Sequence, residues 1–270
     1  MRRFFISVIV GLVFLFNTAF VNAETLAANT VFNTAQIGSG IIKVGYGTEK
    51  DKKLKLFVEK SGKRITYDLK NDGTVESFSL QMGNGDYSVS VLENIEGNKY
   101  TYVSTENVKL DLTDQKEVFL NSVQNINWND EMAAIKKARE LTNGVKEDQD
   151  KINNIYNYII SNINYDFDKL NRLTFDYIPN IDSTLASNKG ICYDYSSTFA
   201  AMLRSAGIPA KLVKGYSTNV NGYHAWNEVY NTKDNKWIII DTTYDSQMKA
   251  ANAKFKMEKE SSEYTKIYEY

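Results

Sequence analysis

The sequence predicts an α+β protein: a β-rich first half that resembles a β-sandwich, then helices followed by an antiparallel sheet. Residues 41–120 alternate apolar and polar side chains in short runs separated by turn residues. Residues 129–207 instead repeat their apolar side chains at helical spacing, and the period of two returns after residue 210. We therefore place two domains, at residues 41–125 and 126–270.

The N-terminus has the pattern of a secretory signal peptide. Arg2 and Arg3 precede an apolar run over residues 4–16, and residues 21–23 form a small-residue cleavage pattern. An uncleaved membrane anchor is the alternative, but the apolar run is short for a bilayer span. We expect residues 1–23 to be removed and the protein to be secreted, either extracellular or associated with the cell wall, with no membrane segment left. We interpret residues 24–40 as a flexible lead-in.

The charge balance is slightly acidic. The chain has 32 Lys and Arg against 33 Asp and Glu, and loss of residues 1–23 removes two Arg and no acid, which leaves 30 against 33. Nucleic-acid partners favour a basic surface, so we expect none. The chain has one Cys and one His. An internal disulfide is therefore impossible, and soft ligands are too few for a closed zinc site. We expect no cofactor.

The first half contains five runs of alternating apolar residues with turn signals between them. The runs are 42–46, 54–58, 65–69, 87–91 and 100–102. Such spacing predicts an antiparallel β-sandwich, and a single twisted sheet packed on the next domain is the alternative. This half has no His or Cys, and its acids are scattered. We see no chemistry in it.

The second half begins with helical periodicity. Asn129 or Asp130 is a candidate N-cap for a first helix that reaches Leu141. The other predicted helices cover residues 147–163, 183–187 and 192–207. Predicted strands follow at 210–216, 223–230 and 236–242, with turns at Gly222 and at 234–235. The last twenty residues add one more strand or helix.

Cys192 is the first candidate for chemistry, because it stands where the third long helix begins. The free N–H groups and the dipole of a helix N-terminus favour an anion there, and the same N–H groups can hold an oxyanion. A nucleophilic thiolate needs both features. A Cys packed inertly under the helix is the alternative.

His224 and Asp241 are candidates to act with this thiol. His224 is the only His, and it opens a predicted strand beside Gly222, so it is the natural general base. Asp241 closes the next strand. A hairpin in which Tyr230 faces Asn235 would place Asp241 opposite His224, where a carboxylate orients the imidazole. The alternatives are a structural His and a turn-capping Asp.

Three segments together resemble the transglutaminase-like superfamily. They are G-I-C-Y-D at 190–194, H-A-W-N-E-V at 224–229 and W-I-I-I-D-T-T-Y-D at 237–245. The resemblance covers roughly residues 129–245. It implies a papain-like core of helices and antiparallel sheet, with a Cys-His-Asp triad that maps onto Cys192, His224 and Asp241. The calcium dependence of some family members does not carry over, since the chain has no calcium loop of the EF-hand pattern.

Other residues near these motifs are candidates for the substrate cleft. Tyr165 belongs to a Tyr-Asp segment that is common upstream of the nucleophile in this family, and Tyr193 and Trp226 adjoin the motif residues. Core packing is the alternative for Tyr165 and Trp226. Asp194 is interpreted as an acid in the first helical turn.

Three functions follow from this sequence. The first is a secreted cysteine acyl-transfer enzyme that acts on peptide or protein amides through a thioester on Cys192, by transfer or hydrolysis. The second is an amidase or peptidase of cell-wall peptides. The third is a catalytically silent surface-binding module with the same fold, because fold alone does not settle the reaction. The acyl donor, the acceptor and the oligomeric state are not readable from the sequence.

Overall fold

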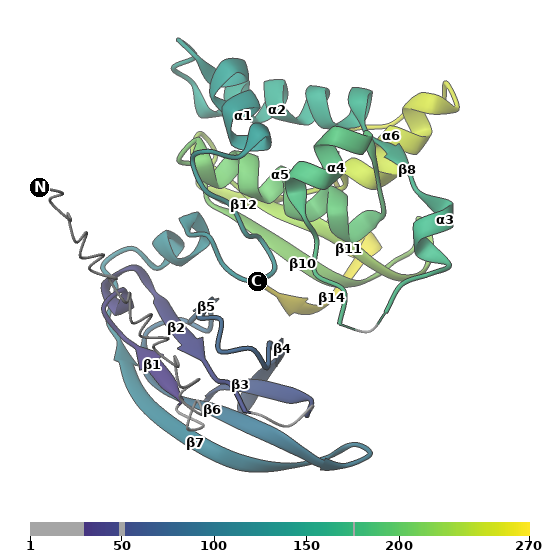
Figure 1. Cartoon of the computed structure of the whole chain (residues 1–270). Helices are drawn as coiled ribbons and strands as arrows, with labels where there is room; N and C mark the ends of the chain where they lie inside the picture. The colour runs from purple at the N-terminus through teal and green to yellow at the C-terminus, as the bar shows by residue number, and fades with distance from the viewer. Residues whose placement is uncertain (1–29, 49–51, 175) are drawn as a thin grey trace, which may run out of the picture.

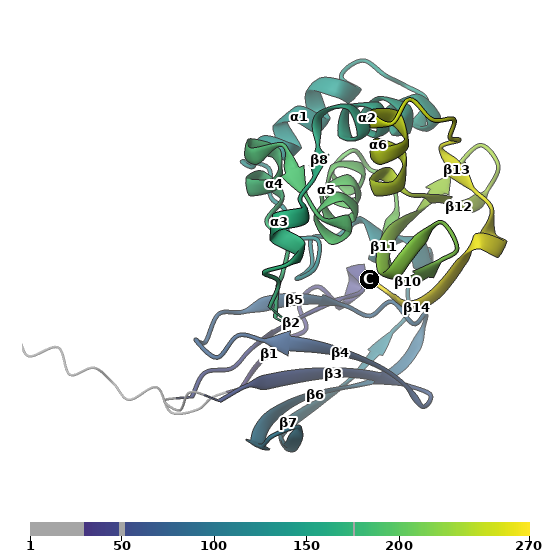
Figure 2. The same ribbon diagram turned by 90° about the vertical axis from the view of Figure 1, so that its right-hand side faces the viewer.

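The computed structural model describes residues 30–48, 52–174 and 176–270. The predicted signal peptide lies outside the described residues. The chain forms a β-rich part and a mixed part of helices and sheet, stacked against each other (Figure 1, Figure 2). None of the helices within the described ranges has both the length and the apolar character required to cross a membrane.

The first part is a sandwich of two antiparallel sheets, so the prediction of a sandwich rather than one twisted sheet is confirmed. One sheet has the strand order β1-β2-β5 and the other β4-β3-β6-β7. The strands are β1 Val31–Asn33, β2 Ile41–Gly45, β3 Leu54–Lys60, β4 Lys63–Leu69, β5 Glu76–Ser79, β6 Gly85–Glu96 and β7 Lys99–Leu110.

Alternation along the strands builds the core of the sandwich. In β3, Leu54, Leu56 and Val58 are buried, and Leu56 and Val58 face Val91 and Val89 of β6 across the ladder. The residues between them point to the other face of the sheet and are half-buried. Each buried aliphatic side chain of this size contributes about 1.5–3 kcal/mol relative to its exposed state.

One prediction for this region is wrong in part, and one strand was missed. Part of the expected lead-in is ordered: β1 pairs with β2, and the short 3₁₀ helix η1 (Ile37–Ser39) follows it. Strand β5, which pairs with β2, was not predicted. Its only large apolar residue is Phe78, which is too few to establish a period of two.

The second part places helices over a five-stranded antiparallel sheet with the order β13-β12-β11-β10-β14. The helices are α1 Ala133–Thr142, α2 Asp148–Asn162, α3 Phe167–Leu170, α4 Ile181–Ser187, α5 Cys192–Ser205 and α6 Thr242–Ala250, with 3₁₀ helices η2 Gln115–Leu120 and η3 Ser261–Glu263. The strands are β10 Ala210–Ser217, β11 Val220–Asn231, β12 Lys236–Ile240, β13 Glu258–Lys259 and β14 Tyr264–Glu269. Strand β8 Asn164–Tyr165 pairs in parallel with β9 Lys189–Gly190.

Helix α5 is the centre of this part. It contacts β10 and β11 of the sheet and the helices α1, α2, α4 and α6 (Figure 2). Its residues 194–204 are all buried, as expected for a helix that is covered on every side. This packing fixes the position of Cys192 at its N-terminus.

The first helix begins differently from the prediction. Its N-cap is Met132, whose side chain makes no capping hydrogen bond. The carboxylate of Asp182 in α4 instead accepts hydrogen bonds from the N–H groups of Ala133 and Ala134, at 3.1 and 3.0 Å. Neither Asn129 nor Asp130 is the cap. A cap supplied from 48 residues away cannot be read from local sequence.

The two hairpins of the sheet also differ from the prediction. The first turn lies between Ser217 and Val220, and Gly222 is inside β11 with a φ of 92°. In the second hairpin Tyr230 pairs with Trp237, not Asn235, so the register is shifted by two residues. The loop at 232–235 is longer than the expected turn. Asp241 is therefore not directly opposite His224.

The two parts share one hydrophobic core. Tyr67 of the sandwich packs edge-to-face on Tyr270, with ring centroids 5.6 Å apart, and Gln81 donates to the carbonyl of Glu269. The buried guanidinium of Arg204 donates to the carbonyls of Asn121, Ala210 and Tyr270 at 2.6–3.0 Å. Burial lowers the pKa of Arg204 to about 9, with the charge of the Tyr67 phenol opposing this.

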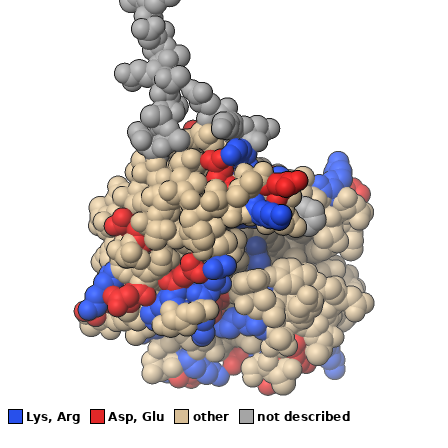
Figure 3. Space-filling view, turned by 90° about the horizontal axis from the view of Figure 1, so that it is seen from below, with Lys and Arg blue, Asp and Glu red and all other residues tan. Residues whose placement is uncertain are grey.

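The underside of the molecule mixes both charge signs, without a continuous patch of either (Figure 3).

Candidate active site

The thiol of Cys192 lies at the first residue of α5, as the sequence predicted. It is a free cysteine with intermediate exposure. The preceding residue, Ile191, is the N-cap, and its N–H donates to the carboxylate of Asp194 at 2.9 Å. A thiolate at this position lies within the favourable field of the first helical turn.

Gly190 has a steric reason to be glycine. A Cβ at this position would lie 2.7 Å from Cβ of Asp194 and 3.2 Å from Cγ2 of Thr184. The backbone of β9 therefore passes close over the first turn of α5, which only a residue without a side chain permits. This close approach explains why a glycine stands two residues before Cys192 in the G-x-C motif.

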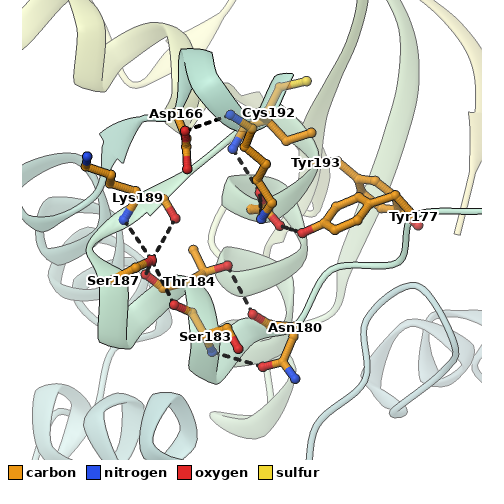
Figure 4. A network of polar contacts seen from close by, with 12 residues as sticks. Asp166, Tyr177, Asn180, Ser183, Thr184, Ser187, Lys189, Cys192 and Tyr193 are labelled. Atoms are coloured by element: carbon orange, nitrogen blue, oxygen red, sulfur yellow. Dashed lines mark hydrogen bonds and ion pairs between the residues drawn. The ribbon is translucent and has the colours of Figure 1, made fainter. Parts of the chain in front are cut away.

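Asp194 is more than an acid of the first turn. Its carboxylate is fully buried and binds the ammonium of Lys169 at 2.7 Å and the hydroxyl of Tyr177, besides the N–H of Ile191. Tyr177 lies beside Tyr193, near Cys192 at the start of the helix (Figure 4). A buried charge needs such partners. These contacts tie the segment that carries α3 to the start of α5 and hold the loop beside Cys192.

His224 of β11 is buried and bonded to Asp241. Its Nε2 lies 2.8 Å from Oδ2 of Asp241, and 3% of its side chain is exposed. Burial lowers the pKa of His224, but the hydrogen bonds and negative charges of Asp241 and Cys192 outweigh burial and raise it to about 10. These interactions with the carboxylate and the thiol favour the imidazolium form of the ring.

Asp241 serves both of the roles weighed from the sequence. Its Oδ1 accepts the N–H of Tyr244 at 3.0 Å and caps α6, while Oδ2 accepts from His224 and from the hydroxyl of Tyr264 at 3.0 Å. Burial and the charge of Asp241 raise the pKa of Tyr264, which keeps its hydroxyl protonated as a donor. The contact between His224 and Asp241 forms diagonally, despite the two-residue error in the predicted register.

Trp226 does not line a cleft, and the prediction that it does is wrong. It is 1% exposed, lies stacked against His224 with centroids 6.3 Å apart, and packs edge-to-face on Tyr264. Gly215 makes room for it, because a Cβ there would approach the ring to 2.9 Å and the carbonyl of Thr265 to 2.0 Å. Trp226 packs against the imidazole and helps to hold it in place.

Tyr193 and Tyr165 line two different cavities. Tyr193 donates to Oδ1 of Asn125 at 2.8 Å, packs edge-to-face on Tyr177 and lines a cavity of about 120 Å³ between the two parts of the chain. Tyr165 lines a different cavity of about 310 Å³, beside α6. Burial, followed by the charges of Cys192 and Asp194, raises the pKa of Tyr165 to about 12. Both side chains are thus near the thiol, and their role in a cleft stays a prediction.

Three residues of this site were missed by the sequence analysis. Tyr264 and Tyr177 come from segments without regular periodicity, so their approach depends on tertiary folding. Lys214 of β10, on which the charge of Cys192 acts, was detectable from the sequence, because it is, like Lys211, a charged residue among the apolar residues of that strand. Among the described residues, no group of three or more His, Cys, Asp or Glu side chains is arranged to hold a metal ion.

Comparison with known proteins finds similarity in the second part of the chain. A model of the transglutaminase-like superfamily matches residues 135–242. The UPF0252 protein MJ1282 of Methanocaldococcus jannaschii is 32% identical over 119 residues, which are 40% of this chain and 33% of that protein. The Uncharacterized protein YebA of Bacillus subtilis is 36% identical over 80 residues, 23% of this chain and 11% of that protein.

The solved structures include a candidate cysteine protease from Cytophaga hutchinsonii, with a TM-score of 0.42 and 19% identity over 72% of this chain and 68% of that one. This chain spans about a third of the length of the first curated relative and less of the second. Residues 135–242 form a transglutaminase-like core, so the resemblance predicted from the three motifs is confirmed for this region.

Proposed function

We propose that this protein, built on a transglutaminase-like core, is a cysteine acyl-transfer enzyme that acts on peptide or protein amides. The observation that carries the proposal is the set of Cys192 at a helix N-terminus, His224 beside it and Asp241 bonded to His224. Nucleophile, base and orienting carboxylate come from three different elements and meet at one point.

The chemistry follows from the positions of the protons. The Cys192 thiolate attacks the carbonyl carbon of the amide, and the oxyanion that forms is held by N–H groups at the start of α5. As the C–N bond breaks, His224 gives its proton to the leaving ammonia or amine, and a thioester remains on Sγ. Water or a primary amine then attacks the thioester and returns one proton to His224, which restores the thiolate–imidazolium pair.

Asp241 and Tyr264 position the base in this scheme. The carboxylate fixes the ring of His224 and stabilises its charged form, while the hydroxyl of Tyr264 and the N–H of Tyr244 hold the carboxylate. Because Asp241 is fully buried, water does not compete for these hydrogen bonds. Trp226 restricts the imidazole from the other side.

Features beside the triad suit a peptide substrate. Tyr223, adjacent to His224, packs edge-to-face on Tyr216 with centroids 5.6 Å apart, and each is about half exposed. Exposed aromatic rings next to a nucleophile can hold a peptide chain. The signal pattern of residues 1–23 supports action outside the cell, so cell-wall peptides join proteins as proposed substrates.

A two-part assay tests this proposal. The purified protein is incubated with glutamine-containing protein and a fluorescent primary amine, and with peptides from cell-wall material. Ammonia release, amine incorporation and peptide fragments are each measured. Incorporation identifies a transferase, and fragments or ammonia without incorporation identify a hydrolase. We expect Cys192→Ala to abolish every activity; a Cys192→Ala protein as active as the wild type would refute the proposal.

A further inference from the structure

Lys214 carries a charge that the described part of the chain leaves without an ionic partner. It lies on β10, opposite Ala225 and Tyr268 in the sheet, and its ammonium is 3.6 Å from the ring centroid of Tyr193 and 5.2 Å from that of Tyr270. Lys211, three residues earlier on the same strand, instead binds the carboxylates of Glu228 and Glu269. Lys214 is half-buried, and an ammonium partly removed from water normally has such an acid.

The ammonium of Lys214 adjoins the cavity of about 120 Å³ between the sandwich and the core. The neutral polar groups that share this cavity include Gln124, Asn125 and Tyr177. Two side-chain carboxylates also line it, but that of Asp68 is bound to Lys55. Asp176, the other, is exposed, and hydrogen bonds from the Thr174 hydroxyl and from its own backbone N–H lower its pKa.

Lys214 is also electrostatically coupled to the nucleophile. Burial lowers the pKa of Lys214 to about 8, while the negative charge of Cys192 raises it. Tyr193, the residue after Cys192, is packed between the two parts and forms the ring on which the ammonium rests. The cavity thus presents a half-buried cation against the ring of the residue that follows Cys192, and an anion that enters it gains a charge-assisted hydrogen bond with reduced competition from water.

We propose that Lys214 binds a carboxylate of the substrate, so that Cys192 acts preferentially on amides with a free carboxylate close to the scissile bond. This rests on the proposed acyl-transfer function and narrows its substrate class. The carboxylate can come from the C-terminus of a short peptide or from an acidic side chain. The small volume of the cavity fits one such group rather than a folded segment.

Three chloroacetyl probes test this inference without knowledge of the natural substrate. N-chloroacetyl-glycine carries a main-chain carboxylate, N-chloroacetyl-aspartic acid α-amide carries a side-chain carboxylate, and N-chloroacetyl-glycinamide is neutral. In each case the Cys192 thiolate displaces chloride and a C–S bond forms. The second-order rate of alkylation is followed by intact mass for the wild type, Lys214→Met, Lys214→Arg and Lys236→Met. Lys236→Met is the control, because it removes an exposed positive charge on β12.

We expect the wild type to prefer one carboxylated probe over the neutral probe by about tenfold, the ratio that a charge-assisted hydrogen bond supports. The preferred probe identifies the source of the carboxylate. Lys214→Met should bring the ratio close to one, whereas Lys214→Arg and Lys236→Met should keep the preference. The charge of His224 is present in all four proteins and cancels in this comparison.

Two outcomes would overturn the inference while the proposed function survives. The first is an unchanged carboxylate preference in Lys214→Met. The second is an equal loss of rate for neutral and charged probes, which would mean that Lys214 supports the thiolate and does not select the substrate. Failure of every probe to alkylate wild-type Cys192 would instead contradict the proposed function itself. Thermal melting of each variant checks that it is folded. If Lys214→Met does not fold, Lys214→Arg, which retains the charge, still tests whether a cation at this position keeps the preference.

Discussion

The two parts of the chain differ in whether they bury charged side chains. Within the described residues, the buried polar side chains of the sandwich are uncharged, and its ion pairs, such as Lys55 with Asp68, are partly exposed. The second part buries the charged residues Asp194, Arg204, Lys211, His224, Asp241 and Asp245. Burial of a charge is costly unless partners compensate it, so the second part gives up stability that the sandwich keeps.

Three of these buried charges meet around one thiol. Asp194 lies two residues after Cys192 in the first turn of α5, and His224 and Asp241 form the pair beside the thiol. Arg204 shows the structural use of buried charge, because its guanidinium satisfies carbonyls between the two parts. The comparison of Arg204 with the charged groups around Cys192 shows that a buried charge alone does not indicate a functional site. Buried charges that surround a nucleophile do indicate one.

The largest expected effect separates the thiol from an ordinary cysteine. At pH 6.5 a thiol with the usual pKa of about 8.5 reacts ~100-fold more slowly than its full thiolate. Because the imidazolium of His224 faces Cys192, we expect wild-type alkylation by iodoacetamide to change little between pH 6.5 and 9. His224→Ala should restore the steep dependence. Intact mass gives the rates.

The matched control for this measurement lies in the sandwich. Asp86→Asn changes an exposed charge on β6 and should leave the profile unaltered. Identical pH profiles for the wild type and His224→Ala would mean that the triad is inactive, and a binding function would then gain support.

The second comparison concerns stability. Asp194→Asn removes a fully buried carboxylate and leaves Lys169 without its partner, which should lower the free energy of unfolding by about 3 kcal/mol. Asp68→Asn removes the 46% exposed partner of Lys55 in the sandwich and should cost about 0–1 kcal/mol. Urea unfolding of both variants measures the difference. Equal losses would show that charge burial does not distinguish the two parts.

The third comparison uses pH. The pKa of His224 is raised from 6.5 to about 10 in the folded protein, so the folded state binds the proton more tightly than the unfolded state. The resulting stabilisation is fully present below pH 6.5 and is lost as the pH rises through 10. We therefore expect the difference in melting temperature between the wild type and His224→Gln to shrink over this window. A constant difference from pH 6 to 10 would be incompatible with the imidazolium.

The sequence predicted the framework of the site because that framework is local. A helix that begins at Cys192 and strands that bring His224 and Asp241 together follow from periodicity and motif spacing. The register between β11 and β12 could not be predicted, because the sequence of the loop at 232–235 does not indicate its length. Side chains brought from a distance, such as Tyr264 and the Asp182 cap, depend on tertiary packing.

The smallest expected effect compares two glycines. Gly62, in the β3–β4 turn, has a φ of 78° with open space around it, so Gly62→Ala should cost about 1–2 kcal/mol through backbone strain alone. Gly190→Ala should cost about 1–3 kcal/mol, because its Cβ would collide with Asp194. The two variants should therefore lose similar amounts of stability, and they should differ in the reactivity of Cys192.

Only Gly190→Ala should slow alkylation of Cys192, because relief of the collision must shift the first turn of α5, where the thiol and the oxyanion-binding N–H groups lie. Alkylation at pH 7, compared with melting temperature for both variants, measures the two effects separately. If Gly62→Ala slowed Cys192 as much as Gly190→Ala, the effect would arise from global loosening. A selective loss in Gly190→Ala would mean that the first turn of α5 itself sets the reactivity of the thiol.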